Sequence, residues 1–166
     1  MGHPKVVAAC LLLVALGTGC ASLRWSVQKA VRTEGTQLVA FPEQVAREYA
    51  CAERKLPYFT IEHSEIVPPR VRSGGEFNHR LVTVLCPAHP TEVAIGRLSE
   101  GIRFRGRLVH SETRERFEIR PGRWIQDAFV ELPRDAEPGV YAYELRFDAP
   151  DVSFEESWSF VVEARP

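Results

Sequence analysis

The feature that most constrains the fold is an alternation of apolar and polar residues that begins at Tyr58 and continues almost to the C-terminus. It is clearest in residues 140–148 and 154–162, where large apolar side chains occupy every second position. A period of two is that of a half-buried β-strand. Turn residues such as Gly74-Gly75 and Pro121-Gly122 separate the alternating segments. The pattern predicts an all-β sandwich or barrel of about seven to eight short strands.

One turn in this region has a recognisable form. Residues 132–143 contain the run Pro138-Gly139-Val140-Tyr141. This run resembles the tyrosine corner of immunoglobulin-like β-sandwiches, in which the tyrosine hydroxyl bonds to backbone just upstream. Antibody domains carry a cysteine two residues after this tyrosine. Tyr143 stands there in this chain, so the resemblance is to the fibronectin type III and macroglobulin-type domains. It implies an immunoglobulin-like antiparallel β-sandwich over residues 58–166, with Tyr141 as its structural corner.

The strand predicted over residues 77–86 is apolar on both faces and therefore needs cover on both sides. The opposite sheet supplies one cover. Residues 41–57 are expected to supply the other cover, because they carry apolar residues at helical spacing. Pro42 marks the start of the predicted helix and Pro57 marks its end. They predict one short N-terminal helix packed on the domain.

The N-terminus has the form of an export signal. Val6–Leu16 is an unbroken apolar run that follows a lysine, and small residues precede Cys20. This stretch resembles the signal peptides of bacterial lipoproteins, which implies that residues 1–19 are removed and that Cys20 carries lipid, including palmitate. Residues 20–40 would then form a tether. Ala21 after the cysteine resembles the sorting pattern for the outer membrane, with the domain facing the periplasm.

Two other interpretations of the N-terminus stay open. Ordinary cleavage near Ala21 would give a soluble periplasmic protein. An uncleaved signal would leave an inner-membrane anchor, because Val6–Leu23 is an uncharged run at the lower limit of spanning length.

The remaining cysteines form a pair. Cys10 leaves with the signal and Cys20 is used by the lipid, so Cys51 and Cys86 remain in an oxidising compartment. We predict a disulfide between them, which also joins the helical segment to the strand that it covers. A zinc site made by the two cysteines and a histidine is the alternative.

The search for chemistry in the sequence finds none of the familiar catalytic motifs. There is no glycine-rich phosphate loop, HExxH, GxSxG or paired CxxC. The histidines are scattered, and His79 is interpreted as a hydrogen-bonded packing residue. Asp127 interrupts an apolar strand and is interpreted as an edge or solvent-facing position. We therefore predict no catalytic residues, no cofactor and no metal, and the net charge of −1 gives no reason to expect nucleic acid as a partner.

Arginine is concentrated in residues 97–123, which hold eight arginines against four glutamates. The alternation here predicts a hairpin of strands 102–110 and 114–120, with its turn at His110–Thr113 and with Leu108 facing inward. In that pairing five arginines share one face: Arg103, Arg105, Arg107, Arg116 and Arg120. Arginine binds phosphate and carboxylate groups in a bidentate manner, so this face is a candidate anion-binding surface. The alternative is a solvated face with scattered ion pairs.

These observations predict a non-enzymatic lipoprotein of the cell envelope that binds an envelope protein or an anionic surface polymer. A structural accessory subunit of an envelope transport or secretion complex is a second hypothesis. An enzyme with an unfamiliar site is a third.

Overall fold

The computed structural model describes Lys29 and residues 32–164. The chain divides into two compact units, residues 1–33 and 34–166, and every described strand belongs to the second. The predicted signal peptide, Cys20 and the first part of the predicted tether lie outside the described residues. No helix among the described residues has the length and apolar character needed to cross a bilayer.

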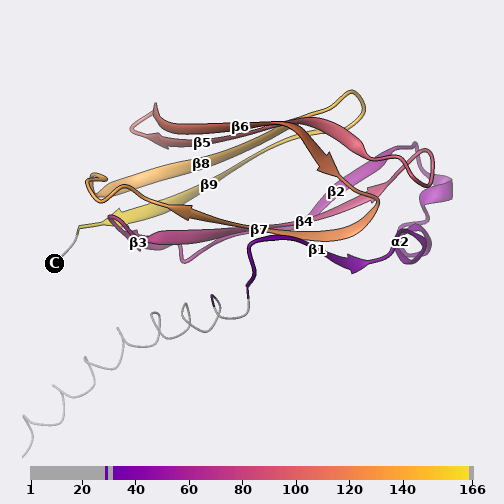
Figure 1. The fold of residues 1–166 in the computed structure, drawn as a ribbon, viewed down its shortest axis with the longest axis horizontal. Coiled ribbons are helices and arrows are strands. Elements are labelled where there is room, and N and C mark those ends of the chain that lie inside the picture. The colour runs from indigo at the N-terminus through magenta and orange to yellow at the C-terminus, as the bar shows by residue number, and fades with distance from the viewer. Residues whose placement is uncertain (1–28, 30–31, 165–166) are drawn as a thin grey trace, which may run out of the picture. The chain divides into compact units, whose positions relative to one another are not determined.

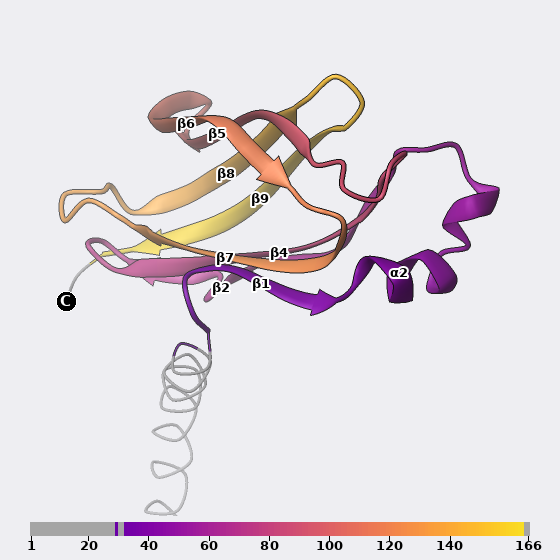
Figure 2. The same cartoon turned by 45° about the vertical axis from the view of Figure 1, so that its right-hand side comes forward.

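The second unit consists of two β-sheets that pack face to face (Figures 1 and 2). The four-stranded sheet is antiparallel and has the order β1 (Gly35–Ala40), β7 (Gly122–Glu131), β4 (Glu76–Cys86) and β2 (Tyr58–Val67). The five-stranded sheet has the order β3 (Arg70–Arg72), β9 (Ser153–Glu163), β8 (Gly139–Asp148), β5 (Ala94–Phe104) and β6 (Arg107–Ile119). Only the short β3 pairs in parallel, with β9. The prediction of a mostly β protein is confirmed.

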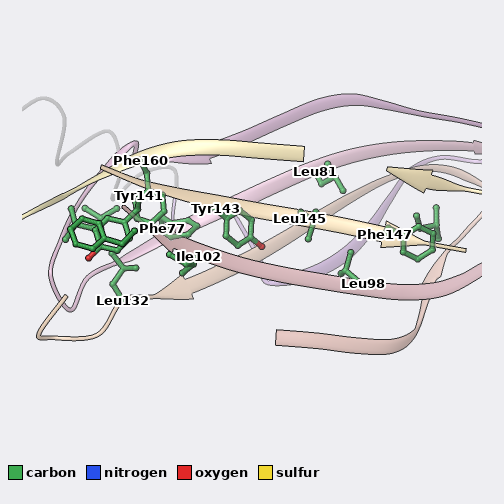
Figure 3. Packing of buried hydrophobic residues seen from close by; sticks show 14 of the residues in the cluster. Phe77, Leu81, Leu98, Ile102, Leu132, Tyr141, Tyr143, Leu145, Phe147 and Phe160 are labelled. Atoms are coloured by element: carbon green, nitrogen blue, oxygen red, sulfur yellow. The ribbon is translucent and has the colours of Figure 1, made fainter. Parts of the chain in front are cut away.

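The core lies between the two sheets and follows from the alternation. Phe77 on β4 contacts Tyr143 on β8 and Phe160 on β9, with ring centroids 5.6 and 4.8 Å apart. Leu98, Leu145 and further apolar residues extend the cluster along the sandwich (Figure 3). The buried residues of the cluster are at most 5% exposed, and full burial of one large apolar side chain stabilises the fold by about 1.5–3 kcal/mol.

The predicted tether is wrong over its last six residues. Gly35–Ala40 forms β1 and pairs with residues 123–127 of β7, so this part of the chain belongs to the sheet. Four of the six residues are exposed, because β1 is an edge strand with little apolar surface to bury. The sequence therefore gives no alternation there from which a strand could be predicted.

The predicted hairpin is wrong in the position of its turn. The turn consists of Arg105 and Gly106, with φ angles of 50° and 78°, and β6 runs without interruption through the predicted turn at His110–Thr113. Positive φ at both residues is the conformation of a type I′ hairpin turn, and glycine adopts it without steric cost. The shift leaves Leu108 half exposed, where the sequence predicts an inward position.

The predicted helical segment is present but shorter than expected. It contains helix α2 (Pro42–Glu48), with Pro42 in its first turn, and a 3₁₀ turn, η1 (Cys51–Glu53). Ala50 between them has a left-handed φ of 48°, which ends the helix before the predicted boundary at Pro57.

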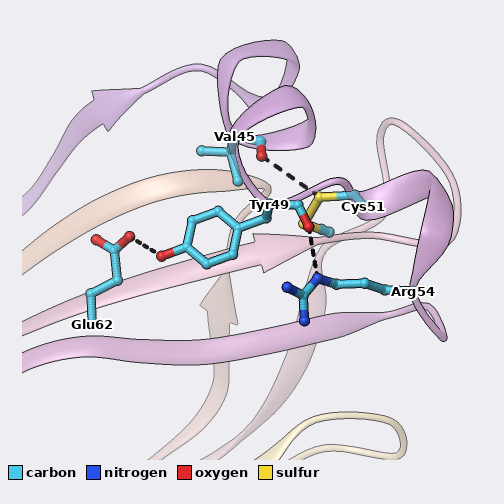
Figure 4. Close-up of a disulfide and its surroundings, with 6 residues drawn as sticks. Val45, Tyr49, Cys51, Arg54 and Glu62 are labelled. Atoms are coloured by element: carbon cyan, nitrogen blue, oxygen red, sulfur yellow. Dashed lines mark hydrogen bonds between the residues drawn. A yellow bond between two sulfur atoms is a disulfide. The ribbon is translucent and has the colours of Figure 1, made fainter.

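The disulfide between Cys51 and Cys86 is confirmed, and it holds this segment against the outer face of β4 (Figure 4). Val45 and Ala40 pack with the two cysteines and Val84 in a second, smaller apolar cluster. This cluster is the cover that the apolar outer face of β4 requires.

An arginine on the four-stranded sheet also holds the segment of α2 and η1 in place. Arg123 on β7 is bonded to Glu62 on β2, with Nε–Oε2 and Nη2–Oε1 distances of 2.6 Å, and to Glu48 on α2 at 2.7 Å. The hydroxyl of Tyr49 donates to Glu62. The Arg123 guanidinium lowers the pKa of Glu62, so this carboxylate stays charged well into the acidic range.

Replacement of both Cys51 and Cys86 by alanine should lower the free energy of unfolding by about 3–4 kcal/mol, because the bond closes a long loop in the unfolded chain. Guanidinium titration at neutral pH measures the change. Reductant should destabilise the wild type by a similar amount and leave the double variant unchanged. A difference below about 1 kcal/mol between wild type and variant would contradict the structural role of the bond.

Candidate functional site

The sandwich is open along one side, where β6 of one sheet approaches β1 and β7 of the other. Two adjoining cavities lie there and share Glu100, Arg114, Ala128 and Tyr143 in their linings. The outer cavity has a volume of about 220 Å³ and the inner one about 60 Å³. We call the two together the groove.

The groove exists because β1 is short. Its pairing with β7 begins at Gly35 opposite Asp127, so Ala128–Glu131 has no strand beside it on that flank among the described residues. The outer cavity is lined by this uncovered end of β7 and by β5 and β6 across from it. Side chains that point between the sheets here therefore reach solvent, which permits polar groups at positions that would otherwise belong to the core.

Polar residues occupy these inward positions through the ordinary alternation of strands. Glu100 lies on β5 between Leu98 and Ile102, which are both buried in the core. On β6, Glu112 is opposite Glu100 and Arg114 is opposite Leu98, so both side chains share the inward face. The inward surface of the sandwich thus changes from apolar to polar toward β6.

Glu100 is the centre of a hydrogen-bonded network. Arg114 binds its Oε1, and the hydroxyl of Tyr143 donates to Oε2 at 3.0 Å. The Tyr143 side chain is almost completely buried, and this burial raises the pKa of its hydroxyl, so the group remains a donor at every physiological pH. Both oxygens of Glu100 are therefore engaged by partners within the protein.

His79 lies at the inner end of the groove. Its ring centroid is 4.4 Å from that of Trp158 and 5.1 Å from that of Tyr143, and its Nε2 is 3.5 Å from the Ser64 Oγ. Burial lowers the pKa of His79 to about 4, so the imidazole is neutral at physiological pH. This environment agrees with the predicted packing histidine.

The rim of the groove is acidic. Glu34, Glu112 and Glu131 line the outer cavity, and none of them forms an ion pair with another described residue. His110 lies at the same rim. Three unneutralised carboxylates around one opening produce a negative local potential.

The predicted arginine face does not form. Arg103 binds Glu144 on β8, Arg105 lies in the turn beside Glu137, and Arg120 binds Glu118, at 2.8, 3.5 and 3.1 Å. Arg107 and Arg116 have no acidic partner within the described part of the chain. The turn at residues 105–106 and the left-handed Arg116 change the direction of the side chains along the hairpin. Glu144 on the neighbouring β8, Glu137 in the loop before β8 and Glu118 on β6 itself also offset part of the local positive charge.

The interpretation of Asp127 as a solvent-facing residue is wrong. Its side chain is buried on β7 and binds Arg80 on the neighbouring β4 through two hydrogen bonds of 3.0 and 2.7 Å. The two residues are directly opposite in register. Pairing with an arginine in this bidentate geometry satisfies a carboxylate that would be costly to bury alone.

The predicted corner bond is present. The hydroxyl of Tyr141 donates to the backbone carbonyl of Glu137, four residues upstream, at 2.9 Å. The Tyr141 ring stacks on Phe104 with a centroid distance of 4.4 Å. This bond fixes the start of β8, the strand that also carries Tyr143 into the groove.

Two weak signals for the groove are present in the sequence, and only the structure makes them clear. Glu100 occupies an inward position between two core residues, and Tyr143 stands where antibody domains have a cysteine. The zinc alternative is overturned, because both cysteines are in the disulfide. No group of three or more histidine, cysteine or acidic side chains in the described residues is arranged to hold a metal ion.

No protein-family model and no curated protein matches the chain. Among solved structures, it is similar to the sporulation control protein Spo0M from Bacillus subtilis, with 14% identity, a TM-score of 0.46, and coverage of 64% of this chain and 50% of that one. The alkylpurine DNA glycosylase AlkC from Pseudomonas fluorescens is 14% identical with a TM-score of 0.46, and the match covers 64% of this chain and 30% of that one. A β-glucosidase from Listeria innocua is 11% identical with a TM-score of 0.43, and the match covers 68% of this chain and 17% of that one. The chain spans half or less of each of these structures, and likenesses of this size assign neither a family nor an activity.

Burial of His79 predicts that stability falls as the pH drops from about 6.5 to 4. The pKa of His79 is about 4 in the folded protein and near 6.5 in the unfolded chain, so the unfolded state takes up the proton first. The loss should approach about 3 kcal/mol at pH 4. Urea unfolding across this range measures it.

A His79→Gln variant should lose this component of the pH dependence, while His89→Gln, at an exposed loop position, should keep it. The two variants separate the histidine from carboxylates such as Glu62, whose lowered pKa places their effect at more acidic pH. Identical pH profiles for wild type and His79→Gln would contradict the assignment.

Proposed function

We propose that the protein is a non-enzymatic binding module of the bacterial cell envelope, held at the outer membrane by lipid on Cys20. Its fold is an immunoglobulin-like sandwich, and the groove is its contact site for a partner. The observation that carries the proposal is the groove itself, a polar opening with an acidic rim beside the apolar core of the sandwich.

The immunoglobulin-like assignment is supported by two features of the second unit. Two sheets of mainly antiparallel strands enclose one core, and the Tyr141 hydroxyl closes the corner before β8. The loops and edges of such sandwiches are suited to binding, although the fold alone does not define a partner.

The anchor is supported by the sequence before the domain. The residues that resemble a lipoprotein signal end at Cys20, and β1 begins at Gly35. The 14 residues between them span at most about 50 Å when fully extended. Two or more acyl chains on Cys20 would therefore hold the domain permanently within this distance of a membrane.

The state of the polar groups favours binding over catalysis. At the inner end of the groove, both oxygens of Glu100 already accept hydrogen bonds, and His79 is buried with a pKa of about 4, so neither of these two groups is poised as a general base. Fixed groups of this kind recognise a ligand by shape and charge.

The charge of the rim indicates the kind of partner. Three unpaired carboxylates at the opening attract lysine or arginine side chains and repel an anionic polymer. With the predicted arginine face absent, a protein partner is better supported than an anionic surface polymer.

Site-specific photocrosslinking in cells tests the proposal. A photoreactive residue at Glu131, on the groove rim, should capture one envelope protein, whereas the same residue at Glu155, exposed on β9, should not. In a Cys20→Ser background the protein should lose its palmitate label, leave the membrane fraction and give much less of the adduct. Cys10→Ser, within the predicted signal, is the matched control and should change none of these results.

Equal capture from Glu131 and Glu155, or none from either, would overturn the groove as the contact site. An unacylated mature protein by intact-mass analysis would overturn the anchor. Recovery of the protein only in an assembly of fixed stoichiometry would favour the accessory-subunit hypothesis instead.

A further inference from the structure

The outermost strand of the five-stranded sheet, β6, has an unusually open edge. It is 13 residues long, its first ten residues are all exposed, and among the described residues it pairs only with β5. The opposite edge of the same sheet is the three-residue β3. Backbone N–H and C=O groups along the free flank of β6 have no strand to bond to, and such an edge is a template for another strand.

Exposed apolar side chains accompany this free edge. Leu108 and Val109 are 50% and 52% exposed, and they are two of the six large apolar residues that are exposed among the described residues. They lie at one end of β6, beside the bulge that separates the pairing of Ile102 from that of Arg103. Between this bulge and the one near Arg116, residues 110–114 form a regular stretch of strand.

The charges in this stretch favour pairing with a second copy in one register. In a pair of antiparallel β6 strands related by a two-fold axis, residues that face each other must have their side chains on the same face of the sheet. This condition is met only when the axis passes through a residue position, so that one residue faces its own copy. If the two-fold axis passes through Glu112, the two copies of this glutamate face each other. If it passes through Arg114, the two copies of this arginine face each other. A centre at Thr113 opposes Glu112 with the second copy's Arg114 twice and also pairs the two threonines.

We infer that β6 pairs with β6 of a second copy, antiparallel and centred on Thr113, so that the two five-stranded sheets form one continuous sheet. The pairing satisfies the free backbone groups and places Glu112 beside the second copy's Arg114, which also binds Glu100 of its own chain. The dimer uses Glu112 of the groove rim, while Glu34 and Glu131, the other two rim carboxylates, take no part in it and stay available to the proposed partner.

Cysteine crosslinking of the full-length protein in its membrane tests the register. Facing residues of antiparallel strands have Cα atoms about 4.5–5.5 Å apart, which is within disulfide range. Thr113→Cys should therefore form a disulfide-linked dimer on mild oxidation. Glu115→Cys is the matched control, because its two copies would lie about 13 Å apart along the strands and should not crosslink.

The same register leads to a second prediction. Ser111→Cys and Glu115→Cys should crosslink to each other when expressed together, and neither should crosslink to itself. Glu112→Arg, which places arginine opposite arginine twice, should weaken the dimer about tenfold in sedimentation equilibrium of the detergent-solubilised protein. This side chain is exposed and has no partner in the described monomer, so the fold should be retained.

Equal crosslinking of Thr113→Cys and Glu115→Cys would overturn the register. A wild-type monomer at all concentrations, or capture of a different protein by the edge of β6, would overturn the inference. Neither result bears on the capture experiment at Glu131, which tests the groove separately.

Discussion

Tyr143 connects the two parts of this structure that matter most, the core and the groove. Its ring packs against Phe77 and His79 from the opposite sheet, and its hydroxyl donates to Glu100. Because the ring is buried in the core, the hydroxyl has little freedom, and the carboxylate that it binds is fixed as well. The orientation of the polar groups in the groove is thus a consequence of the packing between the sheets.

The outer face of the four-stranded sheet is stabilised by a different set of interactions. The disulfide, the small apolar cluster around Val45 and the bonds of Arg123 to Glu62 and Glu48 all hold α2 against this face. Arg80 and Asp127 form a further ion pair on the same two strands, β4 and β7. These contacts make the face rigid without using any residue of the acidic rim.

Sequence reasoning predicted the features that depend on local pattern. The alternation identified most strands, the apolar outer face of β4 required a cover, and the two remaining cysteines predicted the bond that attaches it. The corner at Tyr141 was also visible, because a short run of residues defines it. Each of these depends on neighbours in sequence or on simple counting.

The features that sequence reasoning missed depend on register. Which arginine meets which carboxylate follows from the turn at Arg105-Gly106 and from two bulges, and a shift of a few residues reassigns every facing pair. Asp127 was misplaced because its partner, Arg80, is on another strand. The groove was not predictable for the same reason. It lies where the pairing of β1 with β7 stops, and the sequence of β7 does not indicate where that pairing stops.

The most direct test of this account is a double-mutant cycle on Tyr143 and Glu100. Tyr143→Phe and Glu100→Gln each change one partner of the bond, and the unfolding free energies of both variants and of the double variant give the coupling between them. A hydrogen bond from a buried phenol to a carboxylate predicts a coupling of about 1.5–3 kcal/mol. Additive effects, within about 0.3–0.5 kcal/mol, would contradict the claim that this bond joins the core to the groove.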